Sequence, residues 1–388
     1  MIQMPSFVKD KSLDPLHYHR LARQWCREVR SEHAVFFEPD YRIWVVMRHK
    51  EATRVDGDYA TFSSASRMET NQSIVSMDPP RHTQLRSLVT KAFTVRSIEG
   101  LGPKIESIVN GLLDEVGAQG EMDFMKDFAD PLPVKVIAGM LGMPYEHQWR
   151  NYKAWTNSII NKDKHVLEAM NGFEAAFREA IEEHRREPKE DILQLLLDSE
   201  VEGEYLSEEG LMGFCFTLFI AGHFTTSHLL GNTMLCLDQH PEAFEALRDR
   251  PELLPGALEE VLRYMPPFRL GLSDIISGRT VTSDVMLGEH LIREGDRVVV
   301  PRLSANFDEE EFADPETFRI DRTPNRHITF GHGIHYCLGA PLARLEVSTA
   351  LRLLLQRYPG IRRIPGIPLK QVDSNMVFGV SSLPLQWN

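Results

Sequence analysis

The chain of 388 residues has only four cysteines, and they are far apart. Their spacing matches neither a disulfide framework nor a zinc site, since both need partners at short intervals. This usage is typical of a reducing compartment, so we expect a cytoplasmic protein. The segment from Met1 to Lys11 has no apolar run long enough for a signal peptide or membrane anchor, and we expect neither.

The sequence also lacks a basic excess. Its formal net charge is −13, which makes nucleic acid an unexpected partner and indicates a well-solvated acidic surface. There is no linker, repeat or low-complexity run to mark a domain boundary, although length alone would suggest roughly two or three domains. The hydrophobic share of 42% is enough for a large core.

One apolar stretch, Leu211 to Leu237, is long enough to span a bilayer. Polar residues such as His223, Thr225 and Asn232 interrupt its centre and second half, where they would be costly in lipid. We therefore expect a long helix buried in the middle of a water-soluble fold.

Helical spacing of apolar residues dominates the chain from Thr83 to Tyr264, and the sequence predicts a mainly α protein with small sheets. A strand pair is expected over Ala34–Met47, a strand around Arg297–Val300, and a hairpin over Met376–Trp387. The expected helices begin at Thr83 and then cover 105–116, 132–141, 147–160, 166–186, 191–198, 208–237, 241–249, 251–264 and 341–357.

The most informative segment runs from Phe330 to Gly339 and contains Cys337 in a glycine-rich loop. A lone cysteine can be the single protein ligand of a haem iron, as a thiolate. Glycines such as Gly331 would let the backbone pass close to a flat macrocycle. Hydrogen bonds from backbone N–H groups would tune the electron donation of the sulfur. The alternative for an isolated cysteine is a buried, inert thiol.

This segment, with its continuation to Arg344, closely resembles the haem-binding loop of cytochromes P450, and the resemblance extends in order over nearly the whole chain. It implies the helix-rich triangular P450 fold as one domain over residues 1–388, with haem b as cofactor. It also implies that Cys337 binds the iron and that Phe330, Gly331 and Gly339 contact the haem.

Haem has two propionates, which need cations or hydrogen-bond donors. By resemblance these are His82 and Arg86, which lie i, i+4 on one helical face, together with Arg279 and with His335 of the cysteine loop. The alternative interpretation of each of these residues is an ordinary solvated cation at the surface. The stretch from Pro267 to Arg279 is longer than is usual in the family, so Arg269 competes with Arg279 for this role.

Glu260 and Arg263 form a Glu-x-x-Arg pair, which taken alone is weak evidence. In P450s such a pair forms a buried network with a later arginine, here Arg322. A carboxylate that holds buried arginines in place can fix the segment that presents the cysteine. We expect all three to be structural.

The segment Ala221-Gly222-His223-Phe224-Thr225 resembles the oxygen-binding motif of P450s, in which a threonine faces bound dioxygen. Thr225 is therefore the candidate catalytic residue, and Ala221 and Gly222 are candidate haem contacts. Thr225 could instead only bond back to its own helix. Phe224 replaces the acid that P450s use to relay protons, and it cannot relay any. Water or substrate could deliver the proton, His223 could substitute, or the enzyme could use or leak peroxide.

The resemblance implies a haem-thiolate monooxygenase that inserts one oxygen atom from dioxygen into a lipophilic small molecule. Electrons would come from a ferredoxin and its NAD(P)H-dependent reductase, which would dock on the cysteine side. Two alternatives stay open: a haem-thiolate peroxygenase, isomerase or dehydratase, and a haem-based binding or sensing protein without catalysis. The apolar residues expected to line the pocket are Phe62, Trp155, Ile159, Ile160, Phe216, Phe219, Ile220, Phe224, Phe268, Leu270 and Leu272.

Overall fold

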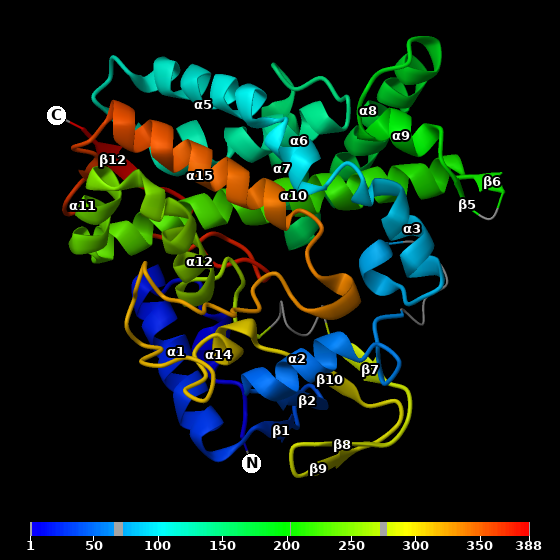
Figure 1. Cartoon of the computed structure of the whole chain (residues 1–388), viewed down its shortest axis with the longest axis vertical. Coiled ribbons are helices and arrows are strands. Elements are labelled where there is room, and N and C mark those ends of the chain that lie inside the picture. Colours follow the sequence, from blue (N-terminus) through cyan, green and yellow to red (C-terminus); the bar gives the residue numbers. More distant parts are fainter. Residues whose placement is uncertain (1, 66–72, 202, 272–277, 388) are drawn as a thin grey trace. The chain divides into compact units, whose positions relative to one another are not determined.

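The computed structural model describes residues 2–65, 73–201, 203–271 and 278–387 (Figure 1). The described chain consists mostly of helices with small sheets, as its apolar spacing predicts. It divides into two compact units. Unit 1 comprises residues 1–65, 228–337 and 362–383, and unit 2 comprises residues 66–227, 338–361 and 384–388. The expectation of one domain over residues 1–388 stays a prediction.

Unit 1 is built around a five-stranded sheet in the order β1-β2-β10-β7-β3. β1 and β2 pair in antiparallel fashion with Val35 opposite Val46, and β10 runs parallel to β2. One core cluster combines Val46 and Val298 of the sheet with Val55 of α2, because alternate strand residues point to the same face. The elements of unit 1 are α1 Pro15–Glu32, β1 Val35–Glu38, β2 Ile43–Val46, α2 His49–Gly57, β3 Phe62–Ser63, α11 Pro241–Asp249, α12 Leu254–Tyr264, β7 Arg279–Val281, β8 Val285–Leu287, β9 His290–Ile292, β10 Arg297–Val299, α14 Arg302–Ala305 and β11 Arg362–Arg363.

Unit 2 is helical, and Figure 1 shows α15 lying alongside α5. α15 buries an apolar stripe that includes Leu342, Val347 and Leu354. The elements of unit 2 are α3 Arg81–Thr90, α4 Val95–Glu99, α5 Gly102–Val116, β4 Glu121–Asp123, α6 Pro131–Met140, α7 Trp149–Asn161, α8 Val166–Arg186, α9 Ile192–Leu197, β5 Glu200–Val201, β6 Glu204–Tyr205, α15 Ala340–Arg357 and β12 Pro384–Gln386.

The long helix α10, Glu208–Gln239, contributes to both units: Ser227 is its last residue in unit 2 and His228 its first in unit 1. By length and composition α10 could cross a membrane, and core helices of water-soluble proteins have the same features. Its polar residue Asn232 is buried and donates from Nδ2 to the carbonyl oxygens of Met265 and Phe378, both at 3.2 Å. This bonding within unit 1 favours a core helix.

The sequence-based helices from Thr83 onward are confirmed to within a few residues, and α8 has the expected bounds. The strand pair over Ala34–Met47 is confirmed as β1 and β2. Helix α1 was not expected. The prediction of a hairpin over Met376–Trp387 was wrong. β12 pairs instead with β4, whose Met122 lies opposite Leu385.

Candidate functional site

The cysteine loop of unit 1 packs directly on the end of α2. Gly331 and Gly333 both have positive φ, at 76° and 70°, a conformation that other residues rarely adopt. A Cβ at Gly333 would lie 2.5 Å from the carbonyl oxygen of Asp56, so only glycine allows this close approach. The backbone N–H of Cys337 donates to the carbonyl oxygen of Phe330 at 2.8 Å and closes the loop.

Cys337 differs from the other cysteines in its exposure. Cys26, Cys215 and Cys236 are buried, and burial raises the pKa of the Cys215 thiol to about 12, so that it stays neutral. Cys337 is half-buried and therefore accessible to a ligand. Among the described residues no group of three or more His, Cys, Asp or Glu side chains could hold a metal ion. Cys337 is the sulfur donor that this loop presents, and a single protein ligand suits a group that brings its other iron ligands with it.

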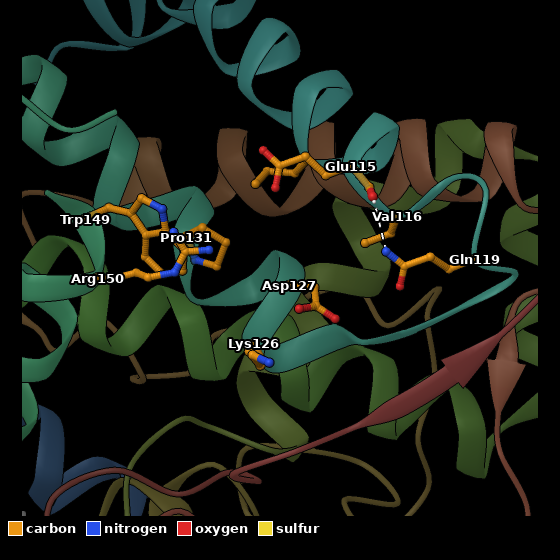
Figure 2. Close-up of a pocket in the computed structure, with 9 residues that line it drawn as sticks. Glu115, Val116, Gln119, Lys126, Asp127, Pro131, Trp149 and Arg150 are labelled. Atoms are coloured by element: carbon orange, nitrogen blue, oxygen red, sulfur yellow. Dashed lines mark hydrogen bonds between the residues drawn. The ribbon is translucent and has the colours of Figure 1, made fainter. Parts of the chain in front are cut away.

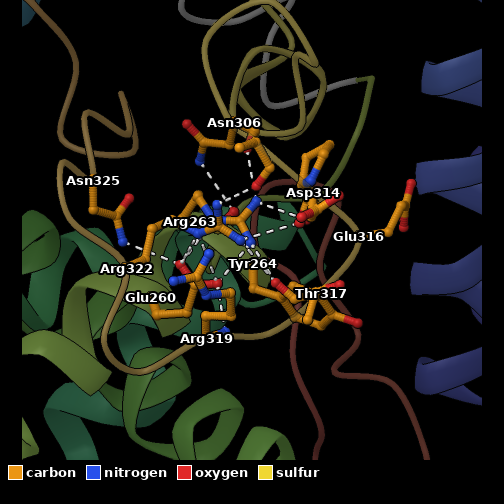
Figure 3. Close-up of polar contacts among 12 residues, drawn as sticks. Glu260, Arg263, Tyr264, Asn306, Asp314, Glu316, Thr317, Arg319, Arg322 and Asn325 are labelled. Atoms are coloured by element: carbon orange, nitrogen blue, oxygen red, sulfur yellow. Dashed lines mark hydrogen bonds and ion pairs between the residues drawn. The ribbon is translucent and has the colours of Figure 1, made fainter.

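A buried network below the loop joins α12 to the segment that precedes the cysteine. Figure 3 shows Arg263 and Arg322 converging on Glu260. Arg263 donates to both carboxylate oxygens of Glu260, at 2.8 Å from Nε and 2.7 Å from Nη2. Arg322 Nε lies 3.1 Å from Glu260 Oε2, and its other nitrogens donate to the carbonyl oxygens of Ala313, Asp314 and Thr317.

This network continues to the cysteine loop through Asn306. Arg263 Nη1 donates to the carbonyl oxygen of Asn306 at 3.0 Å. The side chain of Asn306 accepts from the N–H of Ile328 at 2.9 Å and donates to Thr329 Oγ1 at 2.8 Å. Glu260, Arg263 and Arg322 therefore have the structural surroundings predicted for them, whereas Asn306 was missed because no local pattern marks it.

Three charged side chains gather beside the cysteine loop. Arg302 Nη1 lies 2.6 Å from Asp56 Oδ2, and Arg279 Nη2 lies 3.8 Å from Asp56 Oδ1. A Cβ at Gly331 would lie 3.8 Å from Arg302 Nη2, which places this guanidinium against the loop. His335 is half-buried in the same unit. Arg302 and Asp56 were missed by sequence reasoning, since they come from distant segments.

Arg269, the alternative to Arg279, has a different environment. Its Nε donates to the carbonyl oxygen of Val8 and its Nη2 to that of Asp10, both at 3.0 Å, and its Nη1 donates to the side chain of Gln371. Its guanidinium also lies 4.3 Å from the ring centroid of Tyr18. Arg269 thus anchors the N-terminal segment, and these contacts favour Arg279 for the propionate.

In unit 2, the predicted pair His82 and Arg86 lies on α3 as expected. His82 is buried, and burial together with the nearby Arg86 lowers its pKa. Arg86 is half-buried. Gly339 precedes the first residue of α15.

The candidate oxygen-binding residues lie on the unit 2 part of α10. Ala221 is exposed although it lies in the middle of this long helix, and Thr225, one turn further, is half-buried. Thr225 Oγ1 donates to the carbonyl oxygen of Ala221 at 3.0 Å. A Cβ at Gly222 would lie 3.0 Å from Ile137 of α6. Gly222 is therefore a close packing contact between α10 and α6.

Phe224, which stands where the family has an acid, is buried beside a cation. Lys153 Nζ lies 5.6 Å from the ring centroid of Phe224 and 2.6 Å from Asp130 Oδ1. His223 is also buried, and its Nδ1 lies 2.7 Å from the carbonyl oxygen of Phe219. Burial and the charge of Lys153 lower the pKa of His223 to about 3. A neutral imidazole held in this way is a poor substitute for the missing acid.

The expected pocket lining divides into two groups. Phe62, Phe219, Phe224 and Leu270 are buried in the cores of their units, whereas Trp155, Ile159, Ile160, Phe216, Ile220 and Phe268 are half-buried. Leu272 lies outside the described residues.

Figure 2 shows a separate pocket of about 130 Å³ in unit 2, between the end of α5 and the starts of α6 and α7. None of the predicted site residues lines it. Its walls are formed by Leu112, Glu115, Val116, Gln119, Lys126, Asp127, Pro131, Trp149 and Arg150.

The family model described as "Cytochrome P450" matches residues 121–361. The chain belongs to the cytochrome P450 family. It is 36% identical over 385 residues to cyclomarin C epoxidase CymV of Salinispora arenicola, covering 94% of this chain and 95% of that protein. It is also 36% identical over 389 residues to mycinamicin IV hydroxylase/epoxidase of Micromonospora griseorubida, covering 96% and 97%.

Among solved structures, CYP109E1 from Bacillus megaterium in complex with testosterone matches with a TM-score of 0.87 and 37% identity, over 96% of this chain and 99% of that one. The P450 fold predicted from the sequence is confirmed, and the chain is a P450 monooxygenase. Membership implies a haem iron cofactor, the use of dioxygen, redox partners and a small-molecule substrate. The residues present fit a haem: one accessible thiol on a glycine loop, with two guanidinium groups beside it.

Proposed function

We propose that this P450 monooxygenase inserts one oxygen atom from dioxygen into a lipophilic small molecule, with haem b bound through the thiolate of Cys337. The observation that supports this most is the difference between Cys337 and the other three cysteines. It alone is not buried, and it is presented by a loop that favours glycine at Gly331 and requires it at Gly333.

The other predicted residues have complementary roles in this proposal. When bound, the haem supplies the reduction of dioxygen and the transfer of oxygen to the substrate, and the thiolate donates electron density to it. Arg279, His335, His82 and Arg86 are the residues that would bind the propionates. Phe330, Gly331, Gly339, Ala221 and Gly222 would contact the macrocycle.

Thr225 holds or passes a proton at its Oγ1. The hydroxyl that donates to the Ala221 carbonyl oxygen can still accept a hydrogen bond from water, because a hydroxyl has one donor and two acceptor positions. Since Phe224 has no ionisable group and His223 is held neutral, we propose that water or the substrate delivers protons to Thr225.

The half-buried apolar residues support the proposed substrate class. Trp155, Ile159 and Ile160 on α7, and Phe216 and Ile220 on α10, offer contacts to an apolar molecule. The solved relative binds testosterone, and the named relatives act on cyclomarin C and mycinamicin IV. A fatty-acid, terpene, steroid or polyketide-like compound is therefore the proposed substrate.

Electrons come, in this proposal, from a ferredoxin and its NAD(P)H-dependent reductase in the cytoplasm. Arg81 on α3, the neighbouring Lys91, and Arg96 on α4 are exposed cations of unit 2. On a chain with a net charge of −13, such a basic region would steer an acidic ferredoxin toward it.

A spectral titration tests the proposed function. The purified ferric protein is titrated with fatty acids, terpenes, steroids and macrolides while the iron spin-state band is followed. A low-to-high-spin shift with one class identifies that class, and the product formed with ferredoxin and reductase is then analysed. Turnover with peroxide alone, and none with electron donors, would contradict the proposed electron supply.

A further inference from the structure

The position of Asp56 is unusual for a carboxylate. It lies in the last turn of α2, His49–Gly57, where the partial negative charge of the helix end disfavours an acid. It is also only 4% exposed. A buried carboxylate at a helix C-terminus needs strong compensation, and here two guanidinium groups provide it.

The contacts of Asp56 join three segments around the cysteine loop. Arg302 of α14 contacts both carboxylate oxygens, with Nη1 at 2.6 Å from Oδ2 and Nη2 at 3.5 Å from Oδ1. Arg279 of β7 approaches Oδ1 at 3.8 Å. Positions 331 and 333 of the loop lie against Asp56, since a Cβ at Gly331 would be 4.0 Å from its Oδ2.

We infer that Asp56 is a positioning residue for the haem: it orients Arg302 and Arg279 beside the cysteine loop and shares their positive charge with a haem propionate. This inference rests on the proposed function, because it needs haem bound at Cys337. It also assigns Arg302, which the sequence did not single out, to the same cation set as Arg279.

If Asp56 and a propionate share the positive charge of Arg302 and Arg279, the charge of Asp56 changes haem retention and the reduction potential in a predictable direction. A propionate and Asp56 are both anions that compete for the same guanidinium groups, so the charge of Asp56 weakens haem retention. The same charge also opposes addition of an electron to the haem and so lowers its reduction potential. Removing the charge while keeping an oxygen acceptor for Arg302 therefore strengthens haem binding.

The experiment compares Asp56→Asn with the wild-type holoenzyme in two readouts, the rate of haem transfer to excess apomyoglobin and the ferric/ferrous midpoint potential. We expect haem loss about tenfold slower and a higher potential. The matched control is Asp296→Asn, because Asp296 accepts from Trp44 Nε1 at 3.0 Å and from the N–H of Arg293 at 3.1 Å within the same unit. It should change neither readout.

A merely structural Asp56, which only ties α2 to α14, gives the opposite sign. Haem loss in Asp56→Asn would then be unchanged or faster, at an unchanged potential, and the inference would be overturned. Should Asp56→Asn not fold, Arg302→Gln decides: the inference expects faster haem loss, and unchanged loss overturns it. If the haem-loaded wild type and Cys337→Ser have the same absorption spectrum, the proposed function fails instead. The two failures are therefore distinguishable.

Discussion

Replacing Glu260 with glutamine should destabilise the protein far more than the same change at the neighbouring Glu259. Glu260 is fully buried and accepts hydrogen bonds from Arg263, Arg322, Asn325 and the N–H of Arg319. A glutamine amide keeps the shape of the side chain but offers one acceptor oxygen, and its NH₂ group faces donors. Two buried guanidinium groups then lose their counter-charge.

The expected loss of unfolding free energy in Glu260→Gln follows from the burial of Glu260. Breaking a buried ion pair by removing one partner costs about 3–5 kcal/mol, because the remaining charge stays desolvated. Glu260 pairs with two arginines, so we expect the upper end of that range. Glu259 is partly exposed, and its Oε2 lies 3.1 Å from His327 Nε2, so Glu259→Gln should cost less than about 1 kcal/mol.

The assay is urea unfolding of the haem-loaded protein, followed by far-ultraviolet circular dichroism and by the haem absorption band. Because Asn306 links Arg263 to Ile328 and Thr329 ahead of the cysteine loop, the haem band of Glu260→Gln should be lost before the helical signal. Equal losses of unfolding free energy in Glu260→Gln and Glu259→Gln would refute this reasoning.

The remaining predictions concern a buried acid, the missing acid and the loop. Burial raises the pKa of Glu346 on α15, so the protein is most stable below pH 4.5, where this carboxyl is neutral, and loses stability as pH rises from there to the folded pKa. Glu346→Gln should therefore melt higher than wild type at pH 8 and equally at pH 4, and equal melting at both would contradict this. Phe224→Glu places a carboxylate beside Lys153 and should raise product formed per electron and lower peroxide release, whereas Phe224→Leu should not; an unchanged yield would show that this position does not limit the reaction. Gly333→Ala, at a positive φ and 2.5 Å from the Asp56 carbonyl oxygen, should cost at least about 1–3 kcal/mol and accelerate haem loss, unlike Gly360→Ala, whose Cβ would meet nothing within 4 Å.

The features that could be predicted from the sequence are those that depend on local patterns. Helix α8 was predictable because its apolar residues repeat at helical spacing. The cysteine loop was predictable because its glycines and its cysteine lie within one short segment. Helix α1 was missed because its buried face includes the polar His19 and small residues such as Ala22, which weaken the apolar stripe. Its readable signal was Asp14, which caps the helix by accepting from the N–H groups of Leu16 and His17.

The features that could not be predicted depend on pairing between distant segments. The extended C-terminal residues suggested a hairpin, but Leu385 pairs with Met122 of β4. No pattern in either segment specifies that partner. Likewise, Asp56 and Arg302 are ordinary charged residues in the sequence and become a pair only when α2 and α14 pack together in unit 1.

The central claim is that Cys337 binds the haem iron as a thiolate. It is tested most directly by the absorption spectrum of the reduced, carbon monoxide-bound protein, recorded for wild type, Cys337→Ser and the buried-thiol control Cys215→Ser. The account predicts the long-wavelength Soret band of a thiolate-bound haem in wild type and in Cys215→Ser, and its loss in Cys337→Ser. The same band in Cys337→Ser, or its absence from the haem-loaded wild type, would contradict it.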